Sequence, residues 1–287
     1  LKLISILFLA SCQTLGLVQE DPNGPVKLDL NYESFMTESW LNKAETSLIN
    51  FDFFNENIES EIFFDLNGTT IFIINDDQLN LIDYDSGVIE NTFILETKRI
   101  ISGISVGYNT FLYTDADGVV YAHDLISGDL KWTKELEDVV LSEILITSTG
   151  VFIQTSSDVL YGLDLQNGET QWSKKAQAPL LSIRGTAKPV IFEGLIFTSF
   201  SNGRLAAVRA LDGIQLWEKP ISRLKGSTEL EKLMDADSVA IPINEDVFAA
   251  NYNGSLTRFN IRGGDKIFSV DHSTLKPIVL HNNADRL

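Results

Sequence analysis

Short apolar runs alternate with clusters of turn residues along most of the chain, from about Glu61 onward. The runs are rich in β-branched and aromatic side chains, and they are bounded by Gly, Asn, Asp or Ser. This pattern predicts short β-strands joined by tight turns. We expect strands at residues 62–64, 70–74, 80–82, 111–114, 119–122, 151–154, 159–161, 195–198, 205–208, 247–250 and 256–259.

One turn recurs five times and sets the period of the pattern. Its clearest copy runs from Asp124 to Gly128 and is followed by Trp132, four residues after the glycine. A period of about 40–45 residues, with several short strands in each repeat, indicates a β-propeller. The chain is therefore predicted to be all-β and built from four-stranded antiparallel blades. The anchoring glycines are Gly87, Gly128, Gly168, Gly213 and Gly264, separated by 41, 40, 45 and 51 residues, and the residues four positions later are Asn91, Trp132, Trp172, Trp217 and Phe268.

The chemistry of this turn fits the predicted architecture. An Asp or Asn followed by Ser-Gly or Asn-Gly favours a hairpin, because glycine adopts positive φ without a steric penalty. The aromatic residue that follows is expected to cover the seam with the next blade. A single blade cannot bury both of its faces, so neighbouring blades are expected to stack.

The last part of the chain starts another apolar run after Phe268, at residues 277–280. We expect this run to open a sixth blade, and a sheet that ended at Leu287 would leave strand edges unpaired. The sequence therefore predicts a fragment of about five blades plus the start of a sixth. A closed ring of five blades is the competing arrangement.

Composition narrows the classes of function. The net charge is −18, which argues against binding to nucleic acid and against electrostatic binding to anionic lipid headgroups. Cys12 is the single cysteine of the sequence, so neither a disulfide framework nor a cysteine-based metal cluster is expected. His123, His272 and His281 show no metal-ligand spacing. We predict no catalytic residue, no cofactor and no metal site.

The first twelve residues resemble a bacterial lipoprotein signal. Lys2 precedes an apolar run that is too short to span a bilayer and that ends in Leu9-Ala10-Ser11-Cys12. We expect Cys12 to be lipidated; an ordinary signal peptide that happens to contain a cysteine is the alternative. The predicted organisation is a signal peptide at residues 1–11, a lipidated polar tether at 12–37 and a partial propeller at 38–287.

Two connections depart from the repeat. The first, residues 180–189, contains Leu181 and Ile183 beside Arg184. Two apolar side chains with an arginine are typical of the energetic centre of a protein interface. The simpler interpretation is the first strand of the fourth blade with one exposed arginine.

The second departure is the long connection at residues 222–237, which explains the 51-residue glycine spacing. Ser227 or Thr228 could cap a short helix in it, and Asp235 and Asp237 follow. Two carboxylates without further ligands are too few for a calcium loop. A solvated loop is the simpler interpretation, and neither interpretation predicts catalysis.

Three segments in these connections carry a resemblance to a known family: 181–185, 226–230 and 233–237. Together with the repeats and the lipoprotein signal, they closely resemble the BamB family, lipoproteins of the outer-membrane β-barrel assembly machinery. The resemblance covers essentially the whole chain. It implies an eight-bladed ring and a non-enzymatic scaffold role in the folding and insertion of outer-membrane proteins.

The same resemblance implies partners and a location. In the family, neighbouring loops contact the periplasmic POTRA domains of BamA within the Bam complex, and unfolded outer-membrane proteins are further candidate partners. Gln13 follows the cysteine at a position where Asp usually marks inner-membrane retention, so the resemblance implies an outer-membrane anchor facing the periplasm. The matching partner-binding residues in this chain are Leu181, Ile183, Arg184, Asp235 and Asp237.

Two other functions stay open on the sequence. The repeats alone are similar to those of quinoprotein dehydrogenases and other pyrroloquinoline-quinone-like propellers. Such enzymes need a quinone pocket, a Ca²⁺ site and usually a catalytic Asp, and the sequence shows no calcium-loop pattern. The other possibility is a lipoprotein propeller that binds a different periplasmic partner.

Overall fold

The computed structural model describes residues 63–75, 77–97, 99–177, 179, 182, 186–223, 236, 238–274 and 278–279. Within these residues the chain forms twenty β-strands, and no helix lies among them. The first three sheets contain β1 (Phe63–Asn67), β2 (Thr70–Asn75), β3 (Gln78–Asp83), β4 (Ile89–Ile94); β5 (Ser105–Gly107), β6 (Thr110–Thr114), β7 (Val119–Asp124), β8 (Leu130–Glu135); and β9 (Leu145–Thr147), β10 (Gly150–Gln154), β11 (Val159–Leu163), β12 (Thr170–Lys175). The last two contain β13 (Val190–Phe192), β14 (Leu195–Phe200), β15 (Arg204–Arg209), β16 (Gln215–Pro220); and β17 (Ile241–Ile243), β18 (Asp246–Ala250), β19 (Ser255–Asn260), β20 (Lys266–Asp271).

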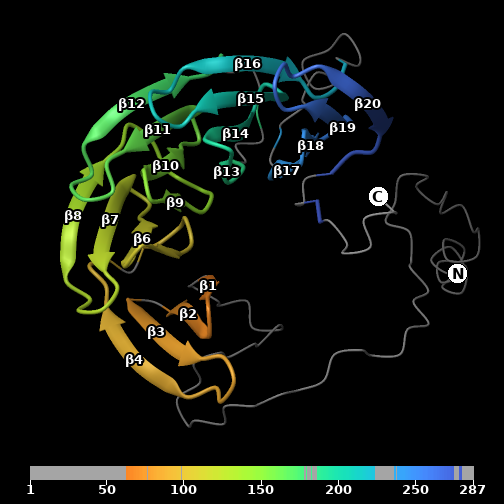
Figure 1. The fold of residues 1–287 in the computed structure, drawn as a ribbon. Helices are drawn as coiled ribbons and strands as arrows, with labels where there is room; N and C mark the ends of the chain where they lie inside the picture. Colours follow the sequence, from red (N-terminus) through yellow and green to blue (C-terminus); the bar gives the residue numbers. More distant parts are fainter. Residues whose placement is uncertain are drawn as a thin grey trace, which may run out of the picture. The chain divides into compact units, whose positions relative to one another are not determined.

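Each sheet is an antiparallel meander of four strands in sequence order. The sheets follow one another along the chain, and the first strands of neighbouring sheets lie against each other, β1 with β5, β5 with β9 and β13 with β17 (Figure 1). This confirms the predicted all-β fold of four-stranded propeller blades. The predicted middle strands are present with small shifts in their bounds. Of the three-residue first strands, only that of the fourth sheet was placed by the sequence, within residues 180–189, and this was wrong because β13 is Val190–Phe192.

The recurring turn follows the third strand of each sheet. In the second sheet, Oδ1 of Asp124 accepts hydrogen bonds from the backbone N–H groups of Ile126 and Ser127 at 2.9 and 3.1 Å. Gly128 closes the turn with a φ of +78° and donates its N–H to the carbonyl oxygen of Asp124 at 2.9 Å. These backbone donors lower the pKa of the Asp124 carboxyl. The predicted hairpin chemistry is confirmed.

The tryptophan that follows each strong copy of the turn closes the seam to the next sheet. The indole Nε1 donates to a backbone carbonyl oxygen in the turn of the following sheet: Trp132 to Leu165, Trp172 to Ala210 and Trp217 to Ile261, at 3.0, 3.0 and 2.7 Å. An added Cβ on Gly168 would stand 2.5 Å from Cε3 of Trp132, so the glycine also makes room for the ring. The expected role of these aromatic residues is confirmed.

The first sheet meets the same requirement with a different residue. The exposed Asn91 occupies the predicted position, but the ring of Phe93, two residues later, lies where a Cβ on Gly128 would be. Phe93 also stacks on Phe111 of the second sheet, with ring centroids 5.9 Å apart. The seam residue of the first blade is therefore Phe93.

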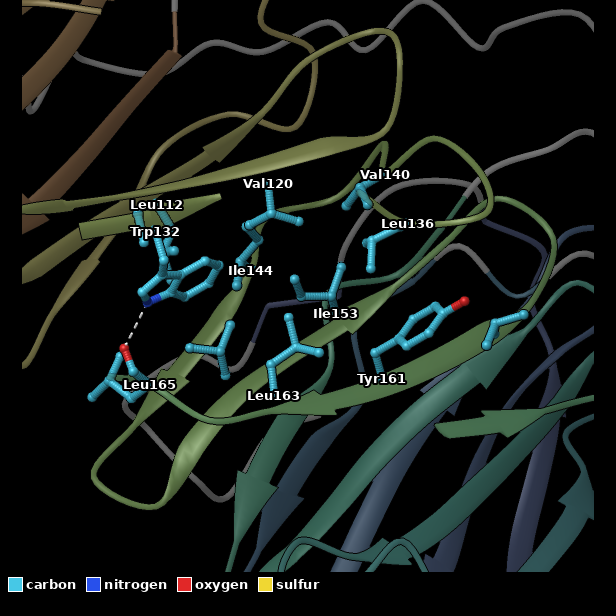
Figure 2. Packing of buried hydrophobic residues seen from close by; sticks show 13 residues of the cluster. Leu112, Val120, Trp132, Leu136, Val140, Ile144, Ile153, Tyr161, Leu163 and Leu165 are labelled. Atoms are coloured by element: carbon cyan, nitrogen blue, oxygen red, sulfur yellow. Dashed lines mark hydrogen bonds between the residues drawn. The ribbon is translucent and has the colours of Figure 1, made fainter. Parts of the chain in front are cut away.

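The cores lie between consecutive sheets. Figure 2 shows the cluster between the second and third sheets, where Trp132, Ile153 and Leu163 are buried together and Trp132 reaches the carbonyl of Leu165. Comparable clusters join the first to the second, the third to the fourth and the fourth to the fifth sheet. Full burial of each large aliphatic side chain stabilises the fold by about 1.5–3 kcal/mol. Packing between sheets thus fixes the strands at which the connections start and end.

Candidate partner-binding face

The connections between sheets gather at one end of the strands, together with the turns between second and third strands. The backbone N–H of Ser156, in such a turn, donates to the carbonyl of Val139 in the connection before β9 at 2.9 Å, and Oγ of Ser156 donates to Oδ2 of Asp138 at 2.9 Å. Nδ2 of Asn202 likewise donates to the carbonyl of Gln177 at 3.0 Å. We call this end of the strands the connection face.

The recurring Asp-Gly turns lie at the other end of the strands. There the N–H of Leu125 donates to the carbonyl of Asn109, and the N–H of Ala210 donates to the carbonyl of Gly194. Asn109 and Gly194 belong to turns between first and second strands. We call this end the turn face. The recurring turns and the connections between sheets thus lie at opposite ends of the strands.

The residues predicted to bind a partner belong, in the sequence, to the connections before β13 and β17, whose described ends lie on the connection face. Leu181, Ile183, Arg184, Asp235 and Asp237 lie outside the described residues, as does Cys12. The described flanks of both connections show how these segments enter and leave the sheets. The first strand of the fourth sheet is β13, which begins at Val190, so the connection at residues 180–189 precedes that strand.

The connection before β13 is fixed on both sides. At its start, the N–H of the buried Ala176 donates to the carbonyl of Asp158 at 2.9 Å. At its end, Ala187 and Pro189 are buried, and Nζ of Lys188 lies 2.5 Å from Oε2 of Glu143. Glu143 belongs to the preceding connection, before β9. The ion pair therefore ties two neighbouring connections together.

The connection before β17 is also fixed where it leaves the fourth sheet. The carbonyl oxygen of the buried Ile221 accepts from Oγ1 of Thr257 at 2.7 Å and from Nζ of Lys266 at 3.0 Å. Burial lowers the pKa of Lys266, with a smaller contribution from the positive charge of Arg223. Oγ of Ser222 lies 2.5 Å from Oδ1 of Asn251 in the fifth sheet. These contacts hold the start of the long connection against the fifth sheet.

The far end of the same connection returns to the core. Ala236, which stands between Asp235 and Asp237 in the sequence, is buried in the cluster of the fourth and fifth sheets. Ser238 and Ala240 are buried just before β17. Since β13 and β17 lie against each other, the two connections enter adjacent strands. The structure thus brings the flanks of both predicted segments to neighbouring places on one face.

Three functional candidates on this face were missed in the sequence. Leu141 stands nine residues after Trp132, just as Leu181 stands nine residues after Trp172, and counting from the tryptophan would have found it. The side chain of Leu141 is 43 % exposed, although its neighbours Val140 and Ser142 are buried. The other two are Glu143 and Lys188, whose pairing had no signal in the sequence.

The described residues show no arrangement suited to metal chemistry. No group of three or more His, Cys, Asp or Glu side chains converges among them as metal ligands. Among the same residues, no helix is long and apolar enough to cross a membrane. His123 is buried in the seam of the first two sheets, with its ring 4.8 Å from that of Phe111. Burial lowers the pKa of His123, which suits a neutral structural role.

Comparison with known proteins identifies a related family. Residues 70–284 match the family model described as outer membrane protein assembly factor BamB. Outer membrane protein assembly factor BamB of Escherichia coli K12 is 31 % identical over 191 residues, which cover 67 % of this chain and 49 % of that protein. The chain spans about half the length of the curated relatives it matches.

Solved structures support the fold. The crystal structure of BamB from Moraxella catarrhalis aligns with a TM-score of 0.68 at 24 % identity, covering 76 % of this chain and 65 % of the other. A europium-containing methanol dehydrogenase aligns with a TM-score of 0.57 at 14 % identity, covering 73 % of this chain and 50 % of the other. At such identities the likeness concerns the fold alone.

Proposed function

Because the chain belongs to the outer membrane protein assembly factor BamB family, we propose that it is a non-enzymatic scaffold of the outer-membrane β-barrel assembly machinery. Its partner in this proposal is the periplasmic POTRA region of BamA, and its role is to assist the folding and insertion of outer-membrane proteins. Unfolded outer-membrane proteins are further candidate partners. The propeller supplies a rigid frame, and the connections supply the binding surface.

The observation that carries the proposal is the position of the two irregular connections. They enter the adjacent strands β13 and β17 on the connection face, and their described flanks are buried or hydrogen-bonded. Fixed ends reduce the conformational entropy that a binding loop loses when it meets a partner. Leu181 and Ile183 would supply apolar contacts, Arg184 would pair with an acid or a carbonyl, and Asp235 and Asp237 would orient Arg184 or bind basic groups of the partner.

Charge reversal at Arg184 tests this proposal. Arg184→Glu should reduce the recovery of BamA in co-purification, because an arginine at the centre of an interface often contributes strongly to binding. The matched control is Arg262→Glu, since Arg262 is exposed on the turn face of the fifth sheet. Unchanged recovery of BamA with Arg184→Glu would count decisively against this site.

The proposal includes a lipid anchor at Cys12 in the outer membrane, with the propeller in the periplasm. Lipoproteins of this kind carry several acyl chains, and more than one chain is needed for stable anchoring. Cys12→Ser should therefore move the protein from the membrane fraction to the soluble periplasmic fraction. Retention of the Cys12→Ser variant in the membrane fraction would exclude Cys12 as the anchor.

A quinoprotein oxidoreductase is the alternative that the repeats left open, and the methanol dehydrogenase shares only the fold with this chain. The Ca²⁺ site of a quinoprotein needs several oxygen ligands, and no suitable cluster of acidic side chains occurs in the described part of the chain. The donor set there does not fit. Dye-linked alcohol oxidation, measured after adding quinone and Ca²⁺, would reveal this activity; we expect none above background.

A further inference from the structure

Asparagine is followed directly by glycine at several turns of the chain. Such a pair is prone to deamidation, because glycine has no side chain to hinder the attack of its backbone nitrogen on the side-chain amide carbon of the asparagine. The surroundings of that nitrogen and that amide decide which pair reacts. Asn23-Gly24 lies outside the described residues, and the described pairs are Asn67-Gly68, Asn167-Gly168, Asn202-Gly203 and Asn253-Gly254.

The pair in the turn between β11 and β12 is held at both reacting groups. The N–H of Gly168 donates to the carbonyl oxygen of Asp164 at 3.0 Å. The side-chain Oδ1 of Asn167 accepts from the N–H of Glu169 at 2.9 Å. The nitrogen of Gly168 can reach the amide carbon only after these hydrogen bonds break. The fold therefore protects Asn167.

The pair in the turn between β14 and β15 is held in a similar way. The N–H of Gly203 donates to the carbonyl oxygen of Phe200 at 2.9 Å. Nδ2 of Asn202 donates to the carbonyl oxygen of Gln177 at 3.0 Å, and its Oδ1 accepts from the N–H of Arg204 at 3.1 Å. Both the attacking nitrogen and the amide that it would attack are thus engaged, and Asn202 is protected.

The pair in the turn between β18 and β19 is protected by packing. Gly254 is buried, and a Cβ on it would stand 2.1 Å from Oδ1 of Asn251 and 2.3 Å from Oγ of Ser222. Deamidation must fold the side chain of Asn253 onto the nitrogen of Gly254 and then admit water. The close contacts around Gly254 leave no room for this ring.

Asn67-Gly68 differs from the other pairs in all of these respects. Asn67 ends β1, Gly68 begins the two-residue loop to β2, and both residues are exposed. Within the described part of the chain, neither the N–H of Gly68 nor the side-chain amide of Asn67 makes a hydrogen bond. Nothing lies within 4 Å of a Cβ position on Gly68, whose φ is +66°. Both reacting groups are therefore free to meet.

We propose that Asn67 is a spontaneous deamidation site of this protein, where the asparagine becomes a mixture of aspartate and isoaspartate. The backbone nitrogen of Gly68 forms a bond to Cγ of Asn67, the bond from Cγ to Nδ2 breaks, and ammonia leaves with the proton of the Gly68 N–H. Water then adds to either carbonyl of the resulting succinimide and opens the ring. The net reaction consumes water and releases ammonia, and it needs no oxidant or reductant. This inference does not depend on the proposed function.

Isoaspartate at this position changes the hairpin between β1 and β2. Its main chain runs through Cβ and Cγ, so it inserts an extra methylene before Gly68 and disturbs the pairing of residue 67 with Thr70. The neighbouring carbonyl oxygen of Thr69 accepts from the N–H of Tyr84 at 2.7 Å, which ties the loop to the turn before β4. We expect deamidation to weaken this hydrogen bond on the turn face.

Ageing of the purified full chain at mildly alkaline pH tests the site. Cleavage after glutamate releases residues 62–90, and fragment masses locate the exchange of an amide for an acid at residue 67. We expect conversion at Asn67 to be at least about tenfold faster than at Asn167 or Asn202, because hydrogen bonds must break before those residues react. Asn67→Gln is the control, since glutamine would have to form a larger ring and should give no product at this position.

The same measurement in urea separates the effect of the fold from that of the sequence. In the unfolded chain, Asn67, Asn167 and Asn202 should react at similar rates. If they do, and Asn67 is no faster than the other two in the folded protein, the hairpin protects Asn67 and the inference is wrong. If all three rates are the same in the folded protein and in urea, the hydrogen bonds give no protection and the inference fails as well.

Hydrogen exchange tests the effect on the hairpin. The Tyr84 amide should exchange faster in aged wild type than in fresh protein, and ageing should not change it in Asn67→Gln. Equal exchange in aged and fresh wild type, with residue 67 converted, would show that the hairpin tolerates the modification and would overturn the expected weakening.

Discussion

The indole Nε1 of Trp132 donates a hydrogen bond to the carbonyl oxygen of Leu165, 3.0 Å away in the next sheet. The ring also occupies the space that a Cβ on Gly168 would take. The Trp172 and Trp217 rings stand in the same relation to Gly213 and Gly264. Each seam thus needs an aromatic residue from one repeat and a glycine from the next, which explains why the two positions recur together in the sequence.

Gly168→Ala should destabilise the protein more than Gly194→Ala. Both glycines have positive φ, +71° and +78°, so both substitutions carry a similar backbone cost of about 1–2 kcal/mol. Alanine at 168 must also displace Trp132, whereas nothing lies within 4 Å of the Cβ position at 194. We expect the free energy of unfolding, measured in urea, to fall by about 1–3 kcal/mol more for Gly168→Ala. Equal losses would show that the Trp132 contact imposes no constraint.

Asp124→Ala should lower the melting temperature more than Asp129→Ala. The Asp124 carboxylate accepts two backbone hydrogen bonds in the turn, and Nδ2 of Asn109 donates to its Oδ2 at 3.0 Å. Asp129 is an exposed acid of the same turn and controls for the change in charge. Asp124→Asn keeps an oxygen acceptor and should lie between wild type and Asp124→Ala in differential scanning fluorimetry. If Asp124→Ala and Asp129→Ala had the same melting temperature, the turn would form without the Asp124 carboxylate.

The glycine spacing predicts the seam residue correctly for the second, third and fourth sheets and wrongly for the first. In the first sheet the exposed Asn91 holds the regular position, and Phe93 fills the seam. The requirement is for an aromatic ring against the next turn, and a residue two positions further along the same strand faces the same side. The four-residue spacing from the glycine therefore cannot predict Phe93, although the alternation of side chains along the strand places Phe93 on the same side as Asn91.

Phe93→Ala should therefore cost far more stability than Asn91→Ala. The phenylalanine ring stacks on Phe111 and lies against Gly128, so its removal opens a cavity at the seam. We expect a loss of about 2 kcal/mol or more in the free energy of unfolding for Phe93→Ala. Asn91→Ala should change it by less than about 0.5 kcal/mol, because its side chain is exposed. If Asn91→Ala lost more free energy of unfolding in urea than Phe93→Ala, Asn91 would be the seam residue after all.

The candidate site was less predictable than the fold. The residue pattern indicated which connections depart from the repeat, because their lengths change the glycine spacing. The pairing of Glu143 with Lys188 joins positions 45 residues apart and depends on how neighbouring sheets stack. The three-residue strands that lead out of the connections are too short to show an alternating pattern.

The buried His123 should make stability depend on pH. Its Nδ1 lies 3.0 Å from the carbonyl oxygen of Gly128, so Nδ1 carries the proton and Nε2 accepts from the hydroxyl of Tyr113 at 3.2 Å. Burial holds the pKa of His123 below its unfolded value of about 6.5. The unfolded chain therefore binds this proton more tightly than the folded chain does. The stabilisation is complete above about pH 6.5 and is lost as the pH falls from there toward the lowered pKa.

Urea unfolding at intervals from about pH 7.5 to 5.5 measures this effect, with a slope of at most about 1.4 kcal/mol per pH unit for one proton. His123→Phe is the control, since it keeps an aromatic ring against Phe111 and cannot titrate. This variant should be less stable at pH 7.5, because Tyr113 and the Gly128 carbonyl lose a partner, but its stability should fall less steeply on acidification. The pKa values of the Asp83 and Asp124 carboxyls are also lowered. Their contribution to stability is lost only at lower pH, below the pKa values that these carboxyls have in the unfolded chain. Parallel curves for wild type and His123→Phe between pH 7.5 and 5.5 would show that His123 does not titrate with unfolding.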